Sequence, residues 1–162
     1  MFDRIWAWIF AFLLSIFPSL DRYSPPLDVK QSVATVISAI KTRDIDTIEA
    51  FMCKNIKDSV PDLRGEIGKM IDTIQGEITS HSSKSYENFY SSKGAIRQSV
   101  SVSEINTSTF KYLINITWEI YNNFSLEERG IRYIGLRLVT DDGYDETLPI
   151  IKATNGIGQV HS

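Results

Sequence analysis

Side chains that could act as nucleophiles or metal ligands are few in this sequence and lie far apart. The 162 residues include one cysteine, Cys53, and two histidines, His81 and His161. A zinc site usually needs four thiolate, imidazole or carboxylate ligands, and a catalytic cysteine needs a base or cation that lowers its thiol pKa. Cys53 instead follows a helical apolar stripe, so we expect it to be buried. The sequence predicts no catalytic residue, no metal ligand and no cofactor.

Acid–base chemistry would need a histidine or carboxylate inside an apolar pocket, where desolvation shifts its pKa. His81 falls on a polar, serine-rich segment, so we expect it at the surface. A position at the mouth of a pocket is the alternative. The segment 141–146 (DDGYDE) groups four carboxylates but lacks the alternating acidic positions and downstream glutamate of an EF-hand. We expect it to be a solvated turn. The serines lack a G-x-S-x-G motif, so a serine hydrolase is not indicated.

Large apolar side chains on two predicted strands are the candidate ligand-binding residues. These candidates are Tyr112, Ile116, Trp118 and Ile134. They either fill the core beneath the helices or line a small-molecule pocket. The inward face of the strand at 109–121 holds no ionisable group except the Tyr112 phenol, because Lys111 and Glu119 alternate outward in this interpretation.

The elements that position these residues change in type at Gly76. Before it, apolar residues recur at helical spacing and predict helices over 28–42, 44–55 and 61–76. Asp28 and Gln31 have the spacing of a capping box at the start of the first helix. Gly76 suits the left-handed position that follows a helix.

After Gly76 the pattern alternates, which predicts strands. We expect strands over 77–85, 95–105, 109–121 and 130–140, and an edge strand over 147–153. The longest of these places one set of side chains on its inward face: Phe110, Tyr112, Ile114, Ile116, Trp118 and Ile120. Ile96, Val100 and Val102 share one face of the strand before it. The order predicts an α+β fold, with N-terminal helices packed on a curved antiparallel sheet that forms a half-cone.

The amino terminus carries a long apolar run. Residues 5–20 include thirteen apolar side chains and no charge. As a helix they would extend about 24 Å, less than the hydrocarbon core of about 30 Å. Trp6 and Trp8 suit a membrane interface, and Arg4 precedes the run. The segment predicts a cleaved signal peptide or a membrane anchor, with a core helix as the remaining alternative. We therefore expect a membrane-anchored or secreted protein on the extracytoplasmic face, in contact with the membrane through residues 5–20.

Length and composition leave room for one domain with a core, since 43% of the residues are hydrophobic and 23% are charged. The predicted divisions are a signal peptide or anchor at 1–20, a proline-containing linker at 21–27, one α+β domain at 28–153 and a tail at 154–162. A net charge of −3 argues against nucleic-acid binding through phosphate neutralisation.

Four segments carry a family resemblance: AIKTRDIDTIEAFMCKN, IQGEITS, STFKYLINITWEI and RYIGLRLV. Their order resembles that of an uncharacterised family of exported proteins from Gram-positive bacteria, known as a domain of unknown function, over roughly residues 28–140. The resemblance implies the cystatin-like half-cone of ketosteroid-isomerase-like and SnoaL-like proteins. Many members carry a lipoprotein signal with an acylated cysteine, and this chain departs there, because Cys53 lies far beyond the apolar segment. The resemblance implies no chemistry.

The leading functional hypothesis is an exported or membrane-anchored domain that binds a small molecule or a protein partner without catalytic machinery. The alternative is a small cone-pocket enzyme of the isomerase or hydratase type. A carboxylate or histidine that faces the pocket would distinguish the two. A homodimer formed through the open sheet face is a third hypothesis, which predicts an exposed apolar patch on 109–121 and its neighbours.

Overall fold

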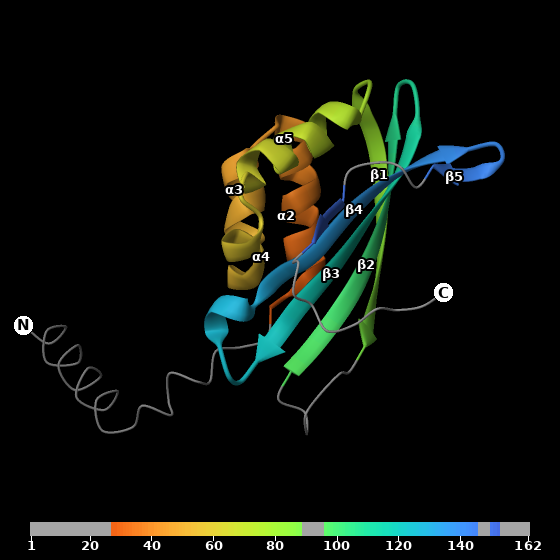
Figure 1. The fold of residues 1–162 in the computed structure, drawn as a ribbon. Helices are drawn as coiled ribbons and strands as arrows, with labels where there is room; N and C mark the ends of the chain where they lie inside the picture. Colours follow the sequence, from red (N-terminus) through yellow and green to blue (C-terminus); the bar gives the residue numbers. More distant parts are fainter. Residues whose placement is uncertain (1–26, 89–95, 146–149, 153–162) are drawn as a thin grey trace, which may run out of the picture.

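The structure, a computed structural model, describes residues 27–88, 96–145 and 150–152. In this part of the chain, helices come first and strands follow (Figure 1). The helices are α2 (Val29–Thr42), α3 (Ile45–Phe51), α4 (Lys54–Ser59), α5 (Leu63–Thr73) and the 3-10 helix η2 (Leu126–Glu128). The strands are β1 (Ile78–Asn88), β2 (Ile96–Thr107), β3 (Lys111–Asn122), β4 (Gly130–Thr140), β5 (Gly143–Asp145) and β6 (Ile150–Lys152).

The predictions for residues 1–20, for most of the linker and for the tail fall outside the described residues. Within the described ranges, every helix is too short or too polar to cross a bilayer.

Aspartate side chains begin three of the helices. Asp28 Oδ1 accepts a hydrogen bond of 3.1 Å from the Gln31 amide at the start of α2. Asp44 and Asp62 do the same for α3 and α5. A cap of this kind satisfies an amide that has no partner within the helix. The predicted helix at 28–42 is confirmed.

The prediction of one helix over 44–55 is wrong, because the helix breaks at Met52 and Cys53. The Cys53 amide donates a 3.1 Å hydrogen bond to the Ile131 carbonyl, and Met52 forms a parallel bridge with Ile131. These pairings with β4 hold the backbone extended at Met52 and Cys53, so α3 ends and α4 begins after the break. The last helix also ends earlier than predicted, at Thr73.

The strands form one antiparallel sheet in the order β1-β2-β3-β4-β5, with β6 paired to β4. The sheet is curved and open, and the helices lie on one of its faces (Figure 1). The α+β prediction is therefore confirmed. The strand predicted at 130–140 has the bounds of β4, and the strand predicted at 109–121 corresponds to β3.

The covered face of the sheet is apolar on β3 and β4 but polar on β2. Ser99, Ser101 and Ser103 of β2 are fully buried on this face, whereas Val100 and Val102 lie on the uncovered face and are only partly buried. The small serines lie in the strand that α2 contacts. Their hydroxyls are bonded: Trp118 Nε1 donates to Ser101 Oγ at 2.8 Å, deep in the core.

Two predictions for the face of β3 are wrong. Phe110 precedes the strand and is 41% exposed, although we expected it to point inward. Glu119, which we expected to point outward, is completely buried. The sheet register shifts twice in this segment, between Thr117 and Trp118 against β4 and between Glu119 and Tyr121 against β2. Such bulges interrupt the alternation of side chains, so Trp118, Glu119 and Ile120 are buried in succession.

Candidate functional site

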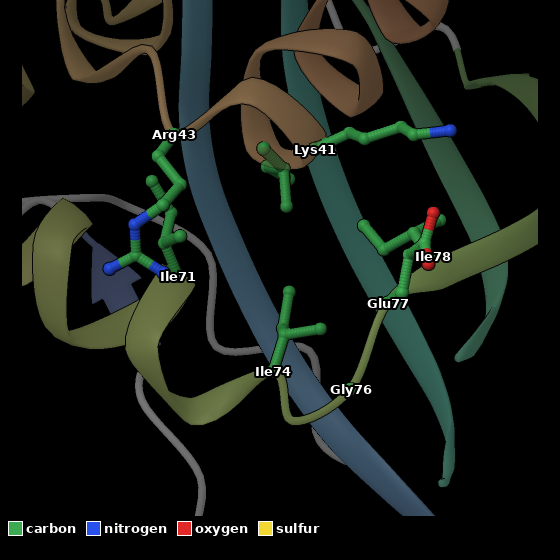
Figure 2. Close-up of a pocket in the computed structure, with 8 residues that line it drawn as sticks. Lys41, Arg43, Ile71, Ile74, Gly76, Glu77 and Ile78 are labelled. Carbon is green, nitrogen blue, oxygen red and sulfur yellow. The ribbon is translucent and has the colours of Figure 1, made fainter. Parts of the chain in front are cut away.

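A depression of about 240 Å³ lies where the carboxyl ends of α2 and α5 meet the start of β1 (Figure 2). We call it the isoleucine depression, because isoleucines form its apolar surface. Its lining residues are Ile40, Lys41, Arg43, Ile71, Ile74, Gly76, Glu77 and Ile78. Ile40, Ile71 and Ile78 are buried and Ile74 is half-buried, so the apolar surface continues directly into the core.

An ion pair closes one side of the isoleucine depression. Arg43 follows the last residue of α2, and its guanidinium bonds Asp72 on α5. Arg43 adopts a left-handed conformation, with φ at 59°, which is uncommon for a residue other than glycine. Its amide reaches back to the Ala39 and Ile40 carbonyls and so satisfies the end of the helix. The backbone therefore fixes where Arg43 leaves α2, and Asp72 fixes where its charge lies.

Two charged groups on the other side of the depression have no ion-pair partner among the described residues. Lys41 and Glu77 are both exposed, and both side chains lie on the side away from Arg43 (Figure 2). Each ion pair of the described chain joins other residues, so the Lys41 ammonium and the Glu77 carboxylate are available to a ligand. The depression thus combines an apolar floor with one cation and one anion that have no ion-pair partner in the part of the chain that the structure describes.

Gly76 shapes the junction between α5 and β1. Its φ of +86° is the left-handed geometry that glycine adopts without strain. A Cβ atom at this position would lie 2.7 Å from Ser108 Oγ and 2.8 Å from Thr109 Oγ1. The left-handed conformation predicted for Gly76 is confirmed, but Gly76 does not directly follow the helix, which is capped at Ile74. The close approach of the 107–109 turn explains why a larger residue does not fit.

The four predicted pocket residues lie in the core and not among the residues that line the isoleucine depression. Tyr112 is 2% exposed, and Ile116, Trp118 and Ile134 are fully buried. The Tyr112 hydroxyl donates to the Thr73 carbonyl at 3.2 Å and accepts from the Gln75 amide at 3.1 Å, which ties β3 to the end of α5. The Trp118 ring packs edge-on against Phe51 of α3, with 5.9 Å between ring centroids. A role for these four residues in ligand binding stays a prediction.

The sequence pattern does not predict the buried polar cluster around Glu119. Arg132 Nη1 donates to Glu119 Oε2 at 2.5 Å, and Asn122 Nδ2 donates to Glu119 Oε1 at 2.5 Å. Burial by itself lowers the pKa of Arg132, but the hydrogen bond and the charge of Glu119 outweigh it, and the net pKa is raised. Both carboxylate oxygens are therefore bonded, and the cluster is suited to holding β3 against β4.

The remaining reactive side chains do not assemble into a site in the described ranges. Cys53 is fully buried, as predicted, and burial raises the pKa of its thiol, which makes it a poor nucleophile. His81 is exposed on β1 and does not line the isoleucine depression. Within the described residues, no three histidine, cysteine or carboxylate side chains gather as metal ligands would. His161 falls outside those residues.

Segments that carry the family resemblance also supply most of the residues that line the isoleucine depression, although side-chain periodicity did not mark them as a site. The lining residues come from the segments AIKTRD and IQGEITS, which both contribute to the family resemblance, and from Ile71 just before the second. Each isoleucine fits a core stripe or a strand face. The depression forms only because two helices end beside the start of one strand.

Comparisons with known proteins give one finding. A family model described as a domain of unknown function (DUF5104) matches residues 35–141, which is more than half of the chain and includes every residue of the depression and of the Glu119 cluster. A comparison with curated proteins gave no significant match.

Proposed function

The chain belongs to this family of domains of unknown function, DUF5104, and from that premise we propose a function on the geometry of the site. The protein is a binding domain without catalytic machinery, and the isoleucine depression takes a small zwitterionic ligand with an apolar side chain. An apolar α-amino acid has this chemistry. The observation that carries the proposal is an isoleucine floor beside Lys41 and Glu77, which form no ion pair within the described ranges.

The apolar floor supplies the affinity in this proposal. Ligand sites are concave and mostly apolar, with a few polar groups that fix orientation. Ile74, the half-buried member, lies between the two charged sides of the depression (Figure 2). Covering it with a branched alkyl group removes apolar surface from water at about 25 cal/mol per Å².

The charges select the class of ligand. Lys41 would pair with the carboxylate of the ligand and Glu77 with its ammonium group, while Arg43 stays engaged with Asp72. A ligand with a single charge would leave Lys41 or Glu77 without a partner. A volume of about 240 Å³ lies below the range of about 300–1,000 Å³ for sites that hold drug-sized molecules, which favours a ligand as small as an amino acid.

We further propose that residues 5–20 hold the domain at the outer face of a membrane, as the apolar run predicts. Mass spectrometry of the protein from its host tests this point. A chain that retains residues 1–20 supports an anchor, whereas a chain that begins after the linker contradicts one. The cystatin-like half-cone remains part of the same proposal, supported by helices on one face of a curved antiparallel sheet.

Thermal unfolding of the full chain in detergent tests the ligand. A ligand at ten times its Kd stabilises the folded state by about 1.4 kcal/mol, which raises the Tm of a domain of this size by about 4 °C. We expect L-leucine at millimolar concentration to raise the Tm in this way. Glycine, which lacks the alkyl group, should not, and 4-methylpentanoate and 3-methylbutylamine, which each lack one charge, should act more weakly.

Lys41→Gln and Glu77→Gln should each reduce the shift caused by leucine. Lys30→Gln is the matched control, because Lys30 is an exposed lysine in the first turn of the same helix, about 16 Å from Lys41 at 1.5 Å per residue. The proposal would be contradicted if leucine raised the Tm of Lys41→Gln as much as that of Lys30→Gln. It would also be contradicted if glycine raised the Tm of the parent chain as much as leucine does.

The isomerase or hydratase alternative would need a titratable group buried in the depression. Glu77 is the acidic residue among the lining residues, and it is exposed. The buried carboxylate of Glu119 is bonded by Arg132 and Asn122 and does not line the depression. Neither observation favours an enzyme.

A further inference from the structure

The loop between β3 and β4 exposes two large apolar side chains. Phe124 is 73% exposed and Leu126 is 46% exposed. The described residues include four exposed large hydrophobic side chains, and two of them lie in this one loop. Apolar side chains that gather at an exposed tip mark an interaction surface more strongly than scattered ones do.

Hydrogen bonds hold this loop in shape. Asn122 Oδ1 accepts from the Phe124 amide at 2.8 Å and from the Ser125 amide at 3.0 Å, and Asn122 itself donates to the buried Glu119. The Asn55 amide on α4 donates to Glu128 Oε2 at 3.4 Å. The exposure of Phe124 is thus fixed by a network that reaches into the core.

The loop lies at the end of the domain where the chain enters from its amino-terminal part. The Leu27 amide donates a 3.0 Å hydrogen bond to the Ile120 carbonyl near the end of β3. Phe124 follows Ile120 by four residues, so the two positions are at most about 14 Å apart along the chain. In the sequence, six residues separate Leu20, the last residue of the apolar run, from Leu27, so the two positions are at most about 25 Å apart along the chain.

We propose that Phe124 and Leu126 insert into the interfacial region of the lipid bilayer that residues 5–20 occupy. This inference rests on the proposed membrane anchoring. A short linker keeps this end of the domain next to the bilayer, and the two side chains gain by leaving water for the acyl-chain boundary. The second contact gives the anchored domain a fixed orientation, in addition to the tether.

A lipid surface fits the loop better than a protein partner does. The exposed side chains lie on the loop that follows Ile120, close to Leu27, so a bilayer that holds residues 5–20 would be the nearest surface to them. Glu127 and Glu128 also follow Leu126 directly, so attraction to anionic lipid is not the driving force. The contact therefore depends on burial of apolar surface, and we expect it in phosphatidylcholine vesicles with little dependence on salt.

The test places an environment-sensitive fluorophore at position 124 of the full chain through Phe124→Cys. Phe110→Cys is the matched control, because Phe110 is an exposed phenylalanine at the opposite end of β3, about 33 Å from Ile120 at the rise of a strand. The unsubstituted chain, whose Cys53 is buried, sets the labelling background. Each labelled chain is reconstituted into phosphatidylcholine vesicles with and without a lipid-borne quencher.

We expect the fluorophore at position 124 to show a blue-shifted emission whose intensity the lipid-borne quencher reduces. The fluorophore at position 110 should show neither the shift nor the quenching. A chain that floats with the vesicles but shows no quenching at position 124, or equal quenching at both positions, overturns the insertion of the loop and leaves the anchor standing. A chain that does not float with the vesicles overturns both the anchor and the insertion. In either case the depression and its ligand are judged separately by the leucine experiment.

Discussion

Replacement of Arg132 by methionine tests the electrostatics of the core. Glu119 is fully buried, and the Arg132 side chain that neutralises it is only 24% exposed. Loss of one partner of a buried ion pair leaves an uncompensated charge and costs about 3–5 kcal/mol. Arg132 reaches some solvent, so we expect Arg132→Met to lower the free energy of unfolding by the smaller of these values, about 3 kcal/mol.

Urea unfolding of the full chain in detergent, monitored by tryptophan fluorescence, measures this loss. The double variant Glu119→Gln/Arg132→Met removes the charge together with its partner and keeps an oxygen that can accept from Asn122. It should therefore be more stable than Arg132→Met alone. A double-mutant cycle measures this coupling between the two substitutions directly.

A double variant that is no more stable than Arg132→Met would contradict this prediction, because the loss of stability would then come from lost packing and not from an unpaired charge. Arg64→Met serves as the control. Arg64 bonds Asp46 and Glu49 at 2.6 Å, but its side chain is 55% exposed. Its loss should have a much smaller effect than the loss of Arg132, because water screens such pairs.

Two further predictions concern the backbone and a helix cap. Gly130→Ala should destabilise the fold by at least about 2 kcal/mol, because φ is +132° and the new Cβ would lie 2.3 Å from the Phe51 carbonyl oxygen. Gly143→Ala is the control, because Gly143 has a φ of +131° but no atom within 4 Å of the new Cβ. Equal losses of stability in urea unfolding would rule out the clash. Hydrogen bonds from the Thr47 hydroxyl and amide lower the pKa of Asp44 below its ordinary value of 3.8, so the cap stabilises the fold above that pH and the stabilisation is lost as the pH falls through the lowered pKa. Between pH 6 and pH 3, Asp44→Asn should lose less stability than the parent chain, and an equal loss would contradict this assignment.

The order of elements followed from local patterns in the sequence. Asp28 before a helical apolar stripe predicted the start of α2, and the alternation after Gly76 predicted the strands. These signals depend on one residue and its near neighbours, and they require no knowledge of what packs against the element. For that reason the α+β class and the bounds of β4 could be derived before the structure.

Features that depend on distant pairing could not be derived in this way. The helix over 44–55 breaks because Cys53 bonds Ile131, which lies 78 residues further along the chain. The burial of Glu119 depends on register shifts against both neighbouring strands, and no local pattern marks them. No local pattern marks Ser99, Ser101 and Ser103 of β2 as buried, because their interior position depends on the contact with α2 and on hydrogen bonds such as the one from Trp118 to Ser101.

The site itself illustrates the same limit. Ile40 belongs to the stripe of α2, Ile71 to that of α5, and Ile78 to the start of β1. Each is explained by core packing within its own element. The depression exists only because α2 and α5 end beside the start of β1, and Lys41 and Glu77 lie at its side.

Isoleucine methyl NMR during a titration with L-leucine tests the central claim most directly. In the full chain held in lipid nanodiscs, the δ1 methyl signals of the isoleucines that line the depression should shift in a saturable manner. Those of Ile116 and Ile134, which are fully buried beneath the helices, should stay in place. Shifts confined to Ile116 and Ile134 would place the ligand inside the core, and unchanged spectra would remove the proposed ligand altogether.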